Sequence, residues 1–158
     1  MSEKKYDDIS DDLNLSYSEV AAFDQAVTSG EALNYYDNSQ INRATVYKNK
    51  ISGRVGNYFD FYDVLVTFHG SELVSSCTCA ESTEHNVCVH AIALLYGWVN
   101  DGGDFTNVAD ALNKISELPR ERLEIIIKNI LRRHPHLIDD FLDPDRAEWD
   151  EIDQDPTL

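Results

Sequence analysis

The first apolar residues at helical spacing follow Ser16. Ser16 and Glu19 have the spacing of a capping box, which marks the start of a helix. Gly30 suits the end of that helix, and a short helical turn through Tyr36 is predicted to follow it. The apolar positions of the first helix are Val20, Phe23 and Val27. Residues 1–15 are acid-rich and contain few apolar positions, so we expect them to be disordered.

Between residues 41 and 76 the period of the apolar positions changes to two, which predicts antiparallel strands. The expected strands cover 43–55 with a bend near Gly53, then 59–68, then 72–76 after a turn at His69–Gly70. One face of the middle strand is expected to carry Tyr62, Val64, Val66 and Phe68.

The segment 87–99 is apolar on nearly all sides, which is typical of a buried central helix, and Asn86 is its expected cap. Two further helices are predicted, a weaker one over 108–115 and a stronger one that starts at Pro119. The stripe of the stronger helix is Leu123, Ile126, Ile127 and Ile130. A final turn is expected over 137–142.

These elements predict an α+β fold, in which a small antiparallel sheet and a central helix are flanked by N- and C-terminal helices. We expect a single domain over 16–142, with an acidic tail over 143–158. The first residues show no charged and then apolar leader, and no apolar run is long enough to span a bilayer. We therefore expect a soluble, cytoplasmic protein without a membrane partner.

All three cysteines of the chain lie close to one histidine, as Cys77, Cys79, Cys88 and His90. Three cysteines cannot all pair with each other, and thiolate with imidazole is a typical tetrahedral ligand set for zinc. Four protein donors leave no open position, so the predicted Zn²⁺, one per chain, is structural. The alternative is that the cysteines are simply buried without a metal. His85 is the nearest competing histidine, but it lacks the Cys-x-His spacing.

The spacing Cys77-Thr-Cys79, eight residues, then Cys88-Val-His90 followed by an alanine- and leucine-rich helix resembles the SWIM zinc finger. The resemblance is strongest over residues 72–96 and implies a module of two strands and a helix around zinc, here about 72–99. The resemblance also implies binding to DNA or to other proteins. RecA-type recombinases and Swi/Snf-type ATPases are the partners that it suggests. Val89 stands where family members often have a lysine.

The formal net charge is −16, so any binding of nucleic acid requires a local basic patch. Between residues 38 and 59 there are four bases and no acid: Arg43, Lys48, Lys50 and Arg54. They alternate with Tyr47, Tyr58 and Phe59, a combination typical of sequence-tolerant single-strand binding. On a strand, Lys48 and Lys50 would share a face. The alternative is that these lysines are solvated edge charges and that the rings belong to the core.

Together these patterns predict a non-enzymatic zinc protein that acts as a DNA-binding or accessory factor in DNA transactions such as recombination, repair or transcription. A protein-interaction adaptor for a recombinase or a Swi/Snf-type ATPase, without direct DNA contact, is the alternative. Cys88 and His90 also offer a thiol and a base, but both residues are better explained as ligands.

Overall fold

The computed structural model describes residues 9–80 and 87–143. The chain divides into two compact units, Met1–Ala111 and Leu112–Leu158. The boundary lies inside helix α4 (Val108–Ser116). The sequence predicted one domain over 16–142, whereas the structure separates the helices after residue 111 from the sheet-containing unit. Residues 144–158, which make up nearly all of the predicted acidic tail, lie outside the described residues.

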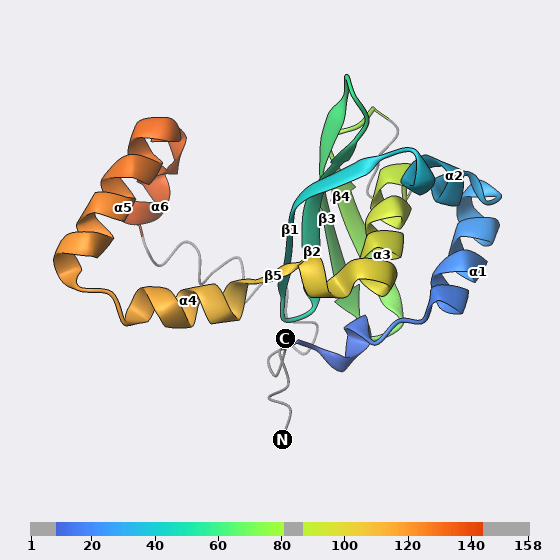
Figure 1. Cartoon of the computed structure of the whole chain (residues 1–158), viewed down its shortest axis with the longest axis horizontal. Helices are drawn as coiled ribbons and strands as arrows, with labels where there is room; N and C mark the ends of the chain where they lie inside the picture. The colour runs from blue at the N-terminus through green and yellow to red at the C-terminus, as the bar shows by residue number, and fades with distance from the viewer. Residues whose placement is uncertain (1–8, 81–86, 144–158) are drawn as a thin grey trace. The chain divides into compact units, whose positions relative to one another are not determined.

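The first unit contains a five-stranded sheet with the order β4-β3-β2-β1-β5 (Figure 1). Its strands are β1 (Gln40–Tyr47), β2 (Lys50–Gly56), β3 (Phe61–His69), β4 (Glu72–Cys77) and β5 (Thr106–Asn107). The first four strands are antiparallel neighbours, but β5 pairs with β1 in parallel. The α+β class is thus confirmed, while the predicted antiparallel sheet is in fact mixed, because the short β5 was not recognised.

The predicted long strand over 43–55 is wrong, because it is two strands joined by a tight turn. Tyr47 pairs with Lys50, and Lys48 adopts a left-handed conformation with φ 53° between them. The irregularity expected near Gly53 lies instead in β1, between Asn42 and Thr45, where the register shifts. A turn made of lysine and asparagine lacks the glycine that usually signals a hairpin, so the pattern of apolar residues continued across it.

Helix α3 (Val89–Asp101) packs on one face of the sheet, and its residues 90–97 are all buried. This confirms the buried central helix. At two places a glycine allows α3 to lie close to the sheet. A Cβ on Gly53 of β2 would meet Cδ1 of Leu94 at 2.9 Å, and a Cβ on Gly97 of α3 would overlap Cδ1 of Ile41. Figure 1 shows α3 between the sheet and the helices α1 and α2.

Helix α1 (Tyr17–Thr28) begins with the predicted capping box. Ser16 Oγ accepts from the backbone N–H of Glu19 at 3.2 Å, and the Glu19 carboxylate accepts from the backbone N–H of Ser16 at 2.7 Å. Helix α2 (Glu31–Asp37) follows, also as predicted. The buried residues of α1 are Val20 and Asp24, whereas Val27 is 44% exposed. The buried face of α1 therefore carries one carboxylate beside its apolar residues.

Residues 9–15 pack against the rest of the first unit, although the sequence predicted disorder there. They include a 3-10 turn, η1 (Asp11–Leu13), and Leu13 is only 2% exposed. Trp98 Nε1 donates to the carbonyl of Leu13 at 2.9 Å, and the N–H of Gly70 donates to Oδ2 of Asp12 at 3.1 Å. Few apolar residues suffice here because one leucine inserts into a core that the rest of the chain builds. Residues 1–8 lie outside the described residues.

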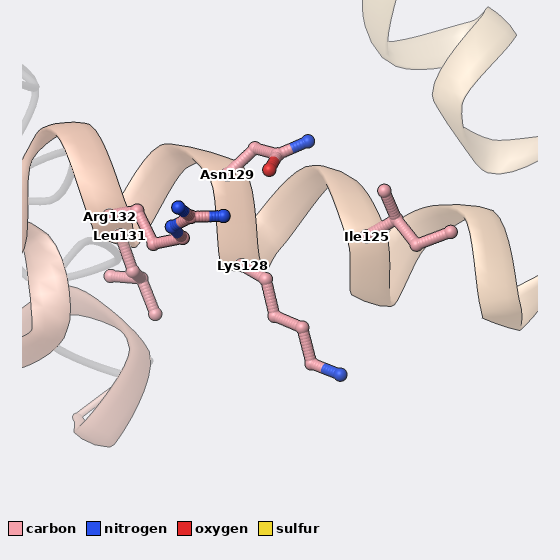
Figure 2. A pocket seen from close by; sticks show the side chains of 5 residues that line it. All are labelled: Ile125, Lys128, Asn129, Leu131 and Arg132. Carbon is pink, nitrogen blue, oxygen red and sulfur yellow. The ribbon is translucent and has the colours of Figure 1, made fainter.

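The second unit contains the end of α4, then α5 (Arg120–Arg133), η3 (Pro135–Leu137) and α6 (Ile138–Leu142). The predicted helices after residue 107 are confirmed. None of the described residues of α5 or α6 is buried, and the α5 stripe is partly exposed. α5 also carries a shallow hollow whose lining comes entirely from this helix, as Figure 2 shows. It is lined by Ile125, Lys128, Asn129, Leu131 and Arg132.

Candidate metal centre

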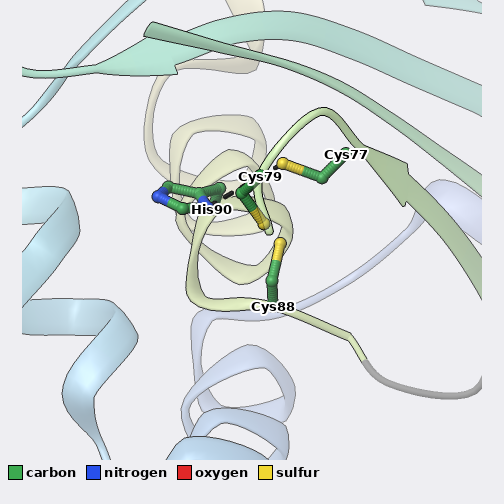
Figure 3. Close-up of side chains that lie close together, drawn as sticks. All are labelled: Cys77, Cys79, Cys88 and His90. Carbon is green, nitrogen blue, oxygen red and sulfur yellow. Dashed lines mark hydrogen bonds between the residues drawn. The ribbon is translucent and has the colours of Figure 1, made fainter. Parts of the chain in front are cut away.

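The end of β4 and the start of α3 bring the three cysteines and one histidine together. Cys77 is the last residue of β4, and Cys79 follows two residues beyond the end of the strand. Cys88 is the N-cap of α3, and His90 lies in the first turn of that helix. In Figure 3 the three sulfur atoms and one nitrogen of the imidazole ring converge. The predicted cluster therefore forms, with Cys79 just beyond the end of the last antiparallel strand.

The distances within the cluster fit a single metal ion. One ligand atom from each of the four residues lies within 4.8 Å of all the others. Cys77 Sγ and His90 Nδ1 are 3.8 Å apart. Around zinc with ordinary bond lengths, the edges of a tetrahedron of sulfur and nitrogen measure about 3.5 to 3.8 Å. The donors need only a small contraction to share one ion, so the cluster can hold a metal.

The Cys-x-Cys segment is held to β3 by two hydrogen bonds from the residue between the ligands. The backbone N–H of Thr78 donates to the carbonyl of Asp63 at 3.2 Å, and Thr78 Oγ1 accepts from the N–H of Asp63 at 3.0 Å. The antiparallel pairing of β3 with β4 ends with Val64 opposite Cys77. These contacts extend the sheet past the first ligand and orient the second.

Two tyrosines from different elements position the ring of His90. The ring of Tyr35 on α2 lies edge-on at a centroid distance of 4.8 Å, and the ring of Tyr62 on β3 lies at 4.3 Å. His90 itself is buried, with 8% exposed. The sequence predicted Tyr62 on one face of its strand with Val64, Val66 and Phe68, but it assigned neither tyrosine to the site. No local signal could have done so, because both contacts cross more than 25 residues of sequence.

Burial sets the electrostatics of Cys77 and Cys88. It raises the pKa of Cys77 and of Cys88, because a low-dielectric environment disfavours the thiolate. Metal binding requires deprotonated cysteines, and a bound cation reverses this preference by supplying the opposite charge. Residues 81–86, which include the alternative ligand His85, lie outside the described residues. The predicted cap Asn86 is wrong, because α3 begins at Val89 and its N-cap is Cys88.

The four bases proposed for nucleic-acid binding do not form one patch. Lys50 and Arg54 occupy even positions of β2, whereas Ile51 and Val55, both 0% exposed, occupy odd positions that face α3. Alternation therefore places Lys50 and Arg54 on the outer face of the sheet. Arg54 also pairs with Asp63 on β3 at 3.6 Å.

The other two bases lie elsewhere on the first unit. Lys48 sits in the turn before β2, with Nζ 5.1 Å from the centroid of the Tyr47 ring. Arg43 lies at the irregularity of β1 with φ 54° and lines a separate hollow. That hollow also contains three acids, Asp37, Asp101 and Asp104. Arg43 therefore lies in a hollow with an acidic lining, to which neither Lys50 nor Arg54 contributes.

Comparison with protein-family models gave no match, and searches of curated proteins and of solved structures likewise gave none. The resemblance to the SWIM finger thus stays a prediction based on the ligand spacing and the helix that follows it. Among the described helices, none combines the length and the apolar character needed to cross a membrane.

Proposed function

We propose that Cys77, Cys79, Cys88 and His90 bind one structural zinc ion, in the manner of a SWIM zinc finger. Three sulfurs with one imidazole nitrogen favour zinc over harder cations, which prefer oxygen ligands. The ion would join the end of β4 to the start of α3, the two elements that supply the ligands. Its role would be to hold the central helix on the sheet.

The proposed site has no enzymatic role. Four protein ligands complete a tetrahedral shell, so no position remains for a water molecule or a substrate. All three thiols of the chain are used as ligands, and a zinc-bound thiolate is not available as a nucleophile. Cysteines that bind zinc instead of forming disulfides are typical of a reducing compartment, which supports the proposal of an intracellular, cytoplasmic protein.

Metal analysis tests the zinc proposal directly. The protein purified without added metal should contain one zinc per chain, and cobalt substitution should give the absorption of a tetrahedral site with sulfur ligands. His90→Ala should lose the metal, whereas His69→Ala, which removes a histidine at the end of β3, should retain it. Two outcomes would contradict this assignment. One is a wild-type protein that contains less than one metal ion per chain, and the other is a His90→Ala variant that retains its metal in full.

We further propose that the protein is an accessory factor in DNA transactions that binds single-stranded DNA through the outer face of β2. The observation that carries this proposal is the position of Lys50 and Arg54 on the same face of one strand. That strand leads into a turn with two exposed aromatic residues, Tyr58 and Phe59. Cations that contact phosphates beside rings that stack on bases are the features of single-strand binding proteins.

Fluorescence anisotropy with single- and double-stranded DNA across a salt series tests this proposal. Binding should weaken as salt rises, because each phosphate contact releases a counterion. Charge reversal by Lys48→Glu with Lys50→Glu should abolish binding without loss of zinc. The matched control is Lys114→Glu with Lys128→Glu, which makes the same charge change on α4 and α5. Unchanged affinity in the first double variant would exclude contact through β2.

A protein-interaction adaptor is the second candidate, and α5 is the observation that favours it. Its isoleucines at 126, 127 and 130 are each exposed by 36 to 37%, and Ile125 by 51%. An amphipathic helix with basic residues in its last turn, Arg132 and Arg133, suits an acidic surface on a protein partner. A recombinase or a Swi/Snf-type ATPase is the kind of partner that we propose. If the anisotropy experiment shows no DNA binding, α5 is the surface to test with candidate partners.

A further inference from the structure

The turn between β2 and β3 exposes two neighbouring aromatic side chains almost completely. Tyr58 is 93% exposed and Phe59 is 91% exposed. Their ring centroids are 6.3 Å apart with planes inclined at 51°, so both rings present faces to solvent. In Figure 1 this hairpin projects beyond the rest of the sheet. Large aromatic side chains are favourable at contact sites because they supply much apolar area with few rotatable bonds.

The same turn borders a hollow lined by amides and aromatic rings. Its volume is about 540 Å³, within the range of small-molecule sites. The lining consists of Asn38, Gln40, Asn57, Tyr58, Phe59 and Phe61. None of these residues carries a charge, although the chain as a whole has a formal net charge of −16. A neutral ligand therefore fits this hollow better than an anion or a cation.

The amides of the hollow retain hydrogen-bonding capacity. Asn38 uses its Nδ2 to donate to the carbonyl of Asn34 at 2.8 Å, and Asn57 Oδ1 accepts from the N–H of Phe59 at 3.4 Å. Within the part of the chain that the structure describes, the side chain of Gln40 has no hydrogen-bond partner. A carboxamide can donate and accept side by side, which matches the edge of a nucleobase.

We propose that this hollow holds one unstacked base of single-stranded DNA. The inference rests on the proposed function and names the part of the strand that the hairpin contacts. Tyr58 or Phe59 would stack on the base, while Gln40 and Asn57 would bind its edge. The guanidinium of Arg54 lies 5.8 Å from the centroid of the Phe61 ring, at the margin of the hollow. Arg54 and Lys50 would contact the phosphates, and the uncharged hollow would take the base.

An abasic probe separates base contacts from phosphate contacts. We would measure binding of the zinc-loaded protein to labelled oligothymidine, to oligodeoxyadenosine, and to an abasic oligonucleotide of equal length and charge. The base-containing strands should bind about tenfold more tightly, since each stacked base contributes to affinity. Tyr58→Ala with Phe59→Ala should remove this difference but keep the salt dependence, which arises from the phosphates.

The amides should determine which base is preferred. Gln40→Leu and Asn57→Ala should reduce any difference in affinity between the thymidine and adenosine strands, with the rings left intact. Val74→Ala is the matched control, because Val74 is a 52% exposed apolar residue on β4, away from the hairpin. It should bind all three probes as the wild type does.

The possible failures are distinguishable. Equal binding of the abasic and base-containing strands, or an unchanged difference in the double ring variant, would overturn the base site. If the Lys48 and Lys50 charge reversal still abolished binding in that case, the proposed function would stand. Absence of binding to every probe by the zinc-loaded wild type would overturn both proposals.

Discussion

The hydroxyl of Tyr96 on α3 donates a hydrogen bond of 2.8 Å to Oδ2 of Asp24 on α1, across 72 residues of sequence. The same carboxylate accepts from the backbone N–H of Leu33 at 3.0 Å and of Ala32 at 3.2 Å, both on α2, and from the hydroxyl of Thr28. Asp24 is only 1% exposed. One buried carboxylate thus connects α1, α2 and α3 and satisfies N–H groups at the start of α2.

The pKa of Asp24 predicts how this network responds to acid. Burial is the largest influence and raises the pKa, but the hydrogen bonds from Thr28, Tyr96, Leu33 and Ala32 outweigh it, so the net pKa is lowered. A lowered pKa in the folded state means that the unfolded state binds the proton more readily. The stabilisation is therefore complete above the unfolded pKa of about 4, and it is lost as pH falls through the folded value.

We expect Asp24→Asn to reduce the free energy of unfolding at pH 7, and the difference from the wild type to shrink below about pH 4. Denaturant unfolding over a pH series measures this difference. Because the other acids are the same in both proteins, their contributions cancel when the variant is subtracted from the wild type. Tyr96→Phe should cost about 1.5 to 3 kcal/mol at pH 7, the usual value of a hydrogen bond to a charged group. A pH-independent difference for Asp24→Asn would show that this carboxylate is not the titrating group.

Removal of the metal should unfold the first unit. Structural zinc contributes about 10 to 16 kcal/mol in small fingers, which is comparable to the whole stability of a domain. We expect Cys88→Ala, or chelation of the wild type, to abolish its cooperative thermal transition as followed by near-ultraviolet circular dichroism. An unchanged transition after verified metal loss would show that the core of α3 and the sheet is sufficient by itself.

The hairpin that carries Tyr58 and Phe59 depends on a glycine at its base. A Cβ on Gly56 would lie 2.7 Å from Cα of Phe61 and would also overlap the carbonyl of Asp60. Both are backbone atoms, which cannot turn away as a side chain could. We expect Gly56→Ala to lower the free energy of unfolding by about 1 to 3 kcal/mol. In Gly103→Ala the new Cβ would meet no atom within 4 Å, so this control should be nearly neutral.

Ser75 on β4 should be replaceable without loss of stability. It is 8% exposed, and its Oγ has no hydrogen-bond partner within the part of the chain that the structure describes. A buried hydroxyl without a partner is costly, so Ser75→Ala should leave the free energy of unfolding unchanged or raise it by about 1 kcal/mol. The neighbouring exposed Ser76→Ala is the comparison. A clear loss of stability in Ser75→Ala alone would indicate that a water molecule binds this hydroxyl.

Some of this architecture follows from the sequence because it depends on nearby residues. The capping box of Ser16 and Glu19 and the alternation of Val64, Val66 and Phe68 are local patterns, and the structure shows both. The cysteines and His90 also lie within fourteen residues of each other, so a strand followed by a helix is enough to bring them together. Short sequence separation leaves few ways to arrange such groups.

Other features were decided only by the tertiary structure. Asp24 looks like one acid among many until the start of α2 and Tyr96 surround it. Lys48 continues an apparent strand until the pairing of β1 with β2 makes it a turn residue. Arg43 belongs to the basic stretch in sequence, yet the shifted register of β1 places it beside three aspartates. These outcomes depend on contacts between distant segments, whose register and burial no local pattern of residues determines.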